Sequence, residues 1–175
     1  MKAMLTGALL CSTLVAAQEI PSRKQMVALL APESITVARG RPGSVELLFR
    51  VQPGYHVNSN QPKQEYLKKT ELKLDPPTDI VVTRISYPKG EDLSFPFAPD
   101  EKLSVYGGDF DVKVGVRPLK TVLPAKYAFH GILKYQACDK AACYPPRQLP
   151  VSFDIKVVKG VEKKRRVTPQ SPHIH

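Results

Sequence analysis

Proline and glycine spacing constrains the fold of this chain more than any other feature. Seventeen prolines and ten glycines break its 175 residues at intervals of about eight to fifteen positions. Proline fixes φ and lacks an amide hydrogen, so it interrupts helices and central strands. No long stretch between these breaks keeps the 3.6-residue apolar period of an amphipathic helix. The sequence therefore predicts an all-β domain made of short strands.

Several of the segments between the breaks alternate apolar with polar residues. In Val45–Val51 and in Val151–Val157 every odd position is apolar, so one face of each strand can enter a core while the other meets water. A chain of this length fits one ordinary domain. We expect a two-sheet β-sandwich of about eight short antiparallel strands, at residues 34–38, 44–51, 55–58, 71–74, 80–87, 110–116, 127–136 and 150–158.

Two stretches, 52–70 and 89–109, carry turn residues and are expected as long loops on the sandwich, where binding sites commonly lie. Composition divides the chain into a signal peptide at 1–17, a linker at 18–31, the folded domain at 32–158 and a basic tail at 159–175. The tail is expected to be solvated. An alternative role is weak contact with anionic lipid headgroups.

The first 17 residues have the organisation of a signal peptide. Lys2 is followed by an apolar run and then by small residues that end at Ala17. Cleavage there predicts export to the periplasm and removes Cys11, which leaves two cysteines. It also leaves 25 basic and 16 acidic residues, a net charge of +9. No basic and aromatic recognition motif for nucleic acid is present, so acidic protein surfaces are the expected partners of this charge.

The two remaining cysteines, Cys138 and Cys143, lie where a strand runs into a loop with two prolines. Two sulfurs can bond when their Cα atoms approach within about 4.4 to 6.8 Å, which a four-residue reversal can supply. As a structural staple, the disulfide closes a loop of six residues and stabilises the folded state by about 2 kcal/mol. As a redox pair it offers one accessible thiol with a resolving partner beside it. The spacing leaves both interpretations open.

Charges near the cysteines are mixed. Lys140 and Arg147 favour a thiolate, whereas Asp139 opposes it. His56 and His130 together with the cysteines are formally a copper or zinc ligand set, but their spacing matches no compact metal motif, and structural roles are expected for both. No catalytic spacing typical of hydrolases and no phosphate-binding glycine loop stands out. A protein-binding module and a metal carrier remain as alternative functions.

The region around the cysteines, Tyr135–Arg147 or YQACDKAACYPPR, resembles the N-terminal periplasmic domain of the thiol:disulfide interchange protein DsbD family. The similarity extends over residues 32–156 and includes Gly54–Asn58, Tyr66–Leu74, Tyr87–Pro88 and Val105–Gly108. It implies an immunoglobulin-like sandwich. It also implies a redox role, in which Cys143 forms the mixed disulfide with a partner and Cys138 resolves it.

The resemblance also implies a cap over the cysteines. The segment Val105, Tyr106, Gly107 aligns with an aromatic cap loop of the family, but Val105 stands where familiar members carry phenylalanine. The seal is therefore expected from Tyr106 or from Phe95 and Phe97, which otherwise anchor a minor apolar cluster. Tyr144 and Pro145, next to Cys143, are expected to contact the partner.

The implied partners are thioredoxin-like periplasmic oxidoreductases, including those of cytochrome c biogenesis. A separate membrane protein is expected as the electron donor. No cofactor, metal or small-molecule substrate is expected, because the disulfide itself carries the electrons. The direction of electron flow remains open at this point.

Overall fold

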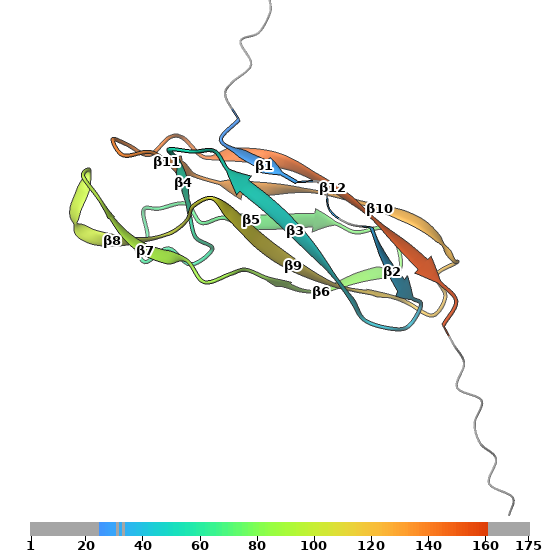
Figure 1. Cartoon of the computed structure of the whole chain (residues 1–175). Helices are drawn as coiled ribbons and strands as arrows, with labels where there is room; N and C mark the ends of the chain where they lie inside the picture. Colours follow the sequence, from blue (N-terminus) through green and yellow to red (C-terminus); the bar gives the residue numbers. More distant parts are fainter. Residues whose placement is uncertain (1–24, 31, 33, 161–175) are drawn as a thin grey trace, which may run out of the picture.

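The computed structural model describes residues 25–30, 32 and 34–160. The expected signal peptide, most of the expected linker and nearly all of the basic tail lie outside these residues. Within the described part of the chain there are twelve strands and no helix (Figure 1): β1 (Val27–Leu29), β2 (Ile35–Ala38), β3 (Gly43–Val51), β4 (His56–Asn58), β5 (Glu71–Asp75), β6 (Ile80–Ser86), β7 (Glu91–Phe95), β8 (Ala98–Tyr106), β9 (Asp109–Pro118), β10 (Ala125–Tyr135), β11 (Ala137–Cys138) and β12 (Arg147–Val158).

Alternating side chains explain why the long strands form a core. Every second residue of β3 from Val45 to Val51 is buried, and β12 repeats the pattern from Leu149 to Val157. The polar residues between them face water, as the alternation predicts. Aromatic rings from different strands pack together in the core, where Phe129 of β10 and Phe153 of β12 stack with centroids 4.8 Å apart. The all-β prediction is confirmed.

Two four-stranded sheets form the sandwich. One has the order β1-β3-β9-β6 and the other the order β2-β12-β10-β5 (Figure 1). Apolar residues from both sheets belong to one buried cluster. All neighbours are antiparallel except β2 and β12, which pair in parallel from Ile35 with Ile155 to Ala38 with Val158. The fold is an immunoglobulin-like β-sandwich, with one parallel pair that the alternation alone did not reveal.

A third sheet lies at one end of the sandwich, in the order β11-β4-β8-β7. The sequence led us to expect residues 89–109 as a long loop. That expectation was wrong, because the segment forms the hairpin β7–β8, with a register irregularity between Leu93 and Phe95. Most of β7 is exposed on both faces, so no apolar alternation marked it. This sheet carries Cys138 on β11 and therefore determines what surrounds the disulfide.

The folded domain begins earlier than residue 32. Strand β1 lies inside the segment expected as a linker and pairs with β3, with Val27 opposite Val51. Met26 is 3% exposed and Val27 is fully buried in the main core. The strand is three residues long, too short for its apolar pattern to be recognised. Among the described residues, no helix has the length and apolarity needed to cross a membrane.

Candidate functional site: a disulfide on a short hairpin

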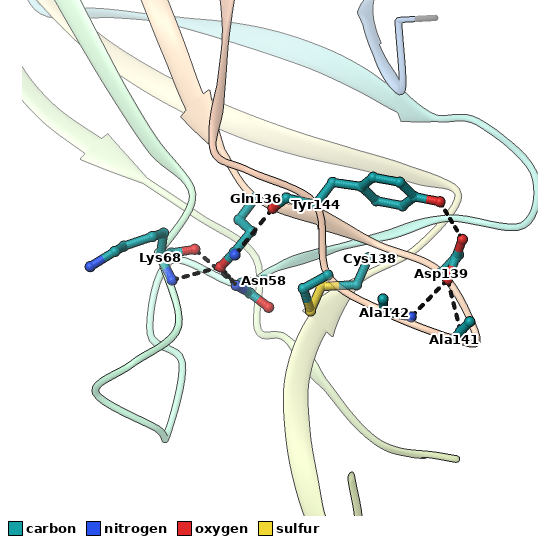
Figure 2. The surroundings of a disulfide bond; sticks show 9 residues. Asn58, Lys68, Gln136, Cys138, Asp139, Ala141, Ala142 and Tyr144 are labelled. Carbon is teal, nitrogen blue, oxygen red and sulfur yellow. Dashed lines mark hydrogen bonds between the residues drawn. A yellow bond between two sulfur atoms is a disulfide. The ribbon is translucent and has the colours of Figure 1, made fainter. Parts of the chain in front are cut away.

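The two cysteines form a disulfide at the end of the domain that holds the third sheet. Strand β10 runs through Gln136 into β11, and the chain then reverses so that Cys143 bridges back to Cys138. The sulfur atoms are 2.03 Å apart, and the Cα atoms are 3.9 Å apart, slightly closer than the range usual for disulfides. Figure 2 shows the bond at the base of this reversal.

Asp139 organises the reversal between the cysteines. Its carboxylate accepts hydrogen bonds from the amides of Ala141 at 2.8 Å and Ala142 at 3.0 Å, and from the Tyr144 hydroxyl at 2.5 Å (Figure 2). This is the way that aspartate commonly stabilises a turn. The Tyr144 hydrogen bond and the two amides hold the pKa of Asp139 below its ordinary value, and the bond to Asp139 raises the pKa of Tyr144 to about 12. Asp139 therefore keeps a negative charge beside the disulfide.

The two sulfur-bearing residues differ in access. Cys138 is fully buried, whereas Cys143 is half-buried and is followed by the exposed Pro145 and Pro146. Of the two cysteines, Cys143 is therefore the more accessible from solvent.

A second polar group, around Gln136, ties the cysteine hairpin to the loop after β4. The Gln136 Oε1 atom accepts from the side-chain amide of Asn58 and from the backbone amide of Lys68, each at 3.0 Å. Its Nε2 donates to the carbonyl of Tyr144 at 3.2 Å. Figure 2 shows Gln136 between the two segments. One side chain thus connects three parts of the site, which fixes the hairpin against the sandwich.

His56 lies directly across the sheet from the buried cysteine. It starts β4 and is the register partner of Cys138 on β11. Its ring stacks on Phe95 of β7 with centroids 3.9 Å apart, and Phe95 stacks in turn on Phe97 at 5.5 Å. Burial lowers the pKa of His56 to about 4, against an opposing attraction from Asp139. The imidazole is therefore neutral at pH 7.

Phe95 and Phe97 also pack on a small buried cluster separate from the main core. Its members are Leu67, Leu103 and Val105. The sequence offered this minor cluster as one role for the two phenylalanines. Because Phe95 also stacks on His56, this cluster extends to the residue that lies opposite Cys138. The β7–β8 hairpin therefore lies over this part of the site.

The segment aligned with the family cap is part of the packed structure. Val105 is fully buried and Tyr106 is 3% exposed. The Tyr106 hydroxyl lies 2.8 Å from Asn60 Oδ1 and 3.0 Å from the Pro88 carbonyl oxygen, either of which can accept its single hydrogen, and it accepts from the Asn60 amide. Gly107 is exposed, with open space around its Cα. Val105 and Tyr106 end β8, two strands away from Cys138 in the third sheet.

Aromatic and basic residues surround the exposed side of the hairpin. Tyr144 is half-buried and its ring lies 5.9 Å from that of Tyr55. A hollow of about 320 Å³ opens next to Pro146. It is lined by Leu67, Lys68, Lys69, Glu71, Lys134, Tyr135 and Pro146. Three of these residues are basic and one, Glu71, is acidic and pairs with Lys69 at 3.2 Å.

His56 and His130, the two histidines considered as metal ligands, lie on different strands, β4 and β10. Within 25–30, 32 and 34–160, no three His, Cys, Asp or Glu side chains gather closely enough to hold an ion. His130 is exposed on β10, where its Nδ1 lies 3.4 Å from the Ser152 hydroxyl. It does not join His56 at the cysteines. The structural role expected for histidines on strands fits His130, whereas His56 has a place at the site that its sequence position did not indicate.

Fold and disulfide together define a class of protein, an immunoglobulin-like β-sandwich with a short-range disulfide between one buried and one half-buried cysteine. The chain belongs to the family described as thiol:disulfide interchange protein DsbD, N-terminal, whose sequence profile matches residues 26–154. The resemblance found in the cysteine motif is thereby confirmed. No curated protein matches the sequence at a significant level.

Several solved structures are similar to the chain. The reduced DsbD N-terminal domain of Neisseria meningitidis is 25% identical, with a TM-score of 0.41, and the match covers 74% of this chain and 85% of that one. A complex of DsbD and PilB N-terminal domains from the same organism gives 22% identity, coverage of 79% and 88%, and a TM-score of 0.40. The N-terminal periplasmic domain of ScsB from Proteus mirabilis gives 12% identity, coverage of 74% and 44%, and a TM-score of 0.46.

Proposed function

We propose that this protein exchanges thiols and disulfides with protein partners in the periplasm through Cys138 and Cys143. The observation that carries the proposal is the unequal access of the two sulfurs, one half-buried and one fully buried, on a hairpin held rigid by Asp139 and Gln136. Exchange requires one thiol that a partner can reach and a second that is held close to it. Membership of the DsbD N-terminal family supports the same reaction.

The proposed reaction has two steps. In the reduced protein the Cys143 thiolate attacks one sulfur of a partner disulfide, and the other partner sulfur leaves as a thiolate. Cys138 then attacks the Cys143 sulfur, which breaks the mixed disulfide and releases the partner as a dithiol. Two electrons pass to the partner, and the domain is left with the Cys138–Cys143 disulfide. A membrane-bound dithiol donor reduces that disulfide again by the reverse sequence.

The partner is proposed to be a thioredoxin-like oxidoreductase with an acidic rim around its own cysteines. Lys68, Lys69 and Lys134 line the hollow beside Pro146, which is three residues after Cys143, and outnumber its one acidic residue, Glu71. Opposite charge steers two such surfaces together and fixes their register, which raises the association rate. Tyr144 and Pro145 are proposed to contact the partner, because they follow Cys143 directly. Oxidoreductases of cytochrome c biogenesis belong to this class of partner.

Reduction potential tests the proposal against its main alternative, a binding module with a structural disulfide. The mature domain is equilibrated with glutathione at graded ratios, and the fraction oxidised is read by thiol alkylation and mass spectrometry. A potential near about −200 mV is expected for an exchange protein, and one well below about −300 mV would overturn the proposal. In the first case, Cys138→Ala is expected to trap partners as mixed disulfides through Cys143, and Cys143→Ala is its matched control.

A further inference from the structure

Among the described residues, the buried side chain of His56 has a nitrogen without a hydrogen-bond partner. The residue is 6% exposed, and the nitrogen is its Nε2 atom. Buried polar atoms in native proteins are almost always paired, because an unpaired one has lost its hydrogen bonds to water without replacement. An exception next to a redox disulfide calls for a functional reason.

The register of the third sheet brings His56 and Cys138 to the same face. The two are direct Cα partners in the antiparallel pair β4 and β11. Side chains of directly opposed residues project to the same side, with Cβ atoms about 4.5 to 5.5 Å apart. The Cβ atoms of His56 and Cys138 are therefore neighbours by strand pairing, and both side chains lie on the same face of the sheet. Reduction breaks the S–S bond and frees the Cys138 side chain to turn about χ1.

A base for the Cys138 thiol has to come from the protein. Cys138 is fully buried, so bulk water does not reach its sulfur. Phe95 stacks on one face of the His56 imidazole. The charged group that acts on His56 is Asp139, whose carboxylate is already engaged by Tyr144 and two backbone amides. His56, neutral at pH 7, is left as the basic group that faces Cys138.

We propose that Nε2 of His56 accepts the proton of the Cys138 thiol when that thiol attacks the mixed disulfide at Cys143. The inference rests on the proposed exchange function and assigns a residue to its second step. As the Cys138–Cys143 bond forms and the bond from Cys143 to the partner breaks, the proton moves to His56. The partner sulfur leaves with the electron pair and takes a proton from the imidazolium or from water. The histidine returns to its neutral state.

The same role explains why Nε2 is unpaired in this structure. The protein is in its disulfide form, in which the Cys138 sulfur carries no proton to donate. In the reduced form the thiol S–H supplies the missing donor. The hydrogen bond is therefore made in one redox state and lost in the other, which favours the reduced state.

A two-stage reaction with a dipyridyl disulfide separates the two steps. One equivalent is added to the reduced mature protein, and the released thiopyridone is followed by absorbance. Attack by Cys143 releases the first equivalent at a rate that depends on reagent concentration. Attack by Cys138 on the resulting mixed disulfide releases the second at a rate independent of that concentration. The reagent remains reactive at acid pH, so both rates can be followed from about pH 3 to 8.

His56→Phe and His56→Gln are the informative variants. Phenylalanine retains a ring to stack on Phe95, and glutamine retains a hydrogen-bonding group, but neither accepts a proton. Both are expected to slow the second release several-fold at pH 6, because an imidazole with a pKa of about 4 is a weak base for a thiol, and to leave the first within about twofold. The wild-type second rate is expected to be nearly flat from pH 5 to 6 and to fall below about pH 4. The variant rates are expected to rise about tenfold per pH unit with thiolate formation.

The possible outcomes are distinct. If the second release is unchanged in both variants, or if both releases slow equally, His56 has no part in the resolving step. His130→Gln, at an exposed histidine, is the matched control and is expected to leave both rates unchanged. If the wild-type protein gives no second release at all, the exchange function itself fails, whatever His56 does. A variant that does not fold is recognised by its near-ultraviolet spectrum.

Equilibrium with glutathione provides a second readout in the same variants. Loss of a hydrogen bond that exists in the reduced state alone is expected to shift the dithiol–disulfide equilibrium toward the disulfide by about tenfold in His56→Phe, equal to about 30 mV. A shift in the opposite direction would contradict the proposed contact.

Discussion

The imidazole of His56 and the ring of Phe95 lie almost parallel, with centroids 3.9 Å and planes 13° apart. The contact joins two strands of the third sheet that are not neighbours, since β8 lies between β4 and β7. It fastens the β7–β8 hairpin over the strand that pairs with Cys138. Because the Phe95 ring lies against the imidazole, we expect the burial of the histidine, and with it the low pKa, to depend on this contact.

Phe95→Ala is therefore expected to raise the pKa of His56 from about 4 toward its ordinary 6.5, because burial is the main cause of the depression. The pKa is measured from the chemical shifts of the imidazole protons in an NMR titration. Phe97→Ala is the control: Phe97 stacks on Phe95 at 5.5 Å, and the expected change is smaller. A His56 pKa that stays near 4 without the Phe95 ring would show that other groups bury it.

The low pKa of His56 also predicts a pH dependence of stability. The unfolded chain binds a proton at the ordinary pKa of 6.5, and the folded protein binds it at about 4. Between these values the unfolded state holds more protons, so the free energy of unfolding falls as the pH is lowered. The contribution is complete above 6.5 and decreases by about 3 kcal/mol as the pH falls to 4.

Urea denaturation of the oxidised protein between pH 4 and 7 measures this slope. His56→Phe is expected to flatten it, because the variant has no buried imidazole to protonate. His130→Gln, which removes an exposed histidine, is expected to keep the wild-type slope. Equal slopes in wild type and His56→Phe would show that His56 does not cause the pH dependence of stability.

The sandwich and the cysteine pair could be predicted from the sequence for clear physical reasons. Alternation in β3 and β12 reports directly on which side chains enter the core. The cysteines are close in sequence, so their pairing needed little knowledge of the fold. Strand β7, by contrast, is exposed along most of its length and forms because β8 lies beside it. Its tertiary pairing left no local pattern to recognise.

The residues that surround the cysteines could not be predicted from the sequence, because their positions depend on strand register. His56 is 82 positions before Cys138, and their opposition follows from the two-residue pairing of β4 with β11. Nothing in the composition of Gly54–Asn58 distinguishes a histidine at the site from one on the surface. Similarly, Tyr106 aligns with a cap residue, yet its hydroxyl is held by Asn60 and Pro88 inside the fold.

Asp139→Ala is expected to weaken formation of the disulfide. The carboxylate holds the two amides of Ala141 and Ala142 and the hydroxyl of Tyr144, and this order keeps the two thiols close in the reduced protein. Without it, the equilibrium constant for closing the disulfide against glutathione is expected to fall several-fold. Asp139→Asn keeps an acceptor for the amides, and a smaller change is expected. An unchanged constant in Asp139→Ala would mean that the reversal is ordered by its other contacts.

Asp139→Asn is also expected to lower the pKa of Tyr144 from about 12 toward 10. The hydrogen bond to the carboxylate is the largest cause of the elevation, and a neutral amide attracts the phenol proton less. Ultraviolet titration of phenolate, compared with Tyr144→Phe to isolate this tyrosine, measures the change. A Tyr144 pKa that remains near 12 in Asp139→Asn would assign the elevation to burial and to Tyr55 instead.

Gln136→Ala is expected to lower the free energy of unfolding by about 2 kcal/mol. Three hydrogen bonds disappear, and the amide of Asn58, a fully buried residue, loses one of its acceptors. Urea denaturation of the oxidised protein measures the loss, and Gln148→Ala, at an exposed position of β12, is expected to cost less than about 0.5 kcal/mol. Because Gln136 and Asn58 share one bond, the double variant with Asn58→Ala is expected to lose less than the sum of the single losses. Additive losses would show that the two side chains act independently and that Gln136 does not connect the loop to the hairpin.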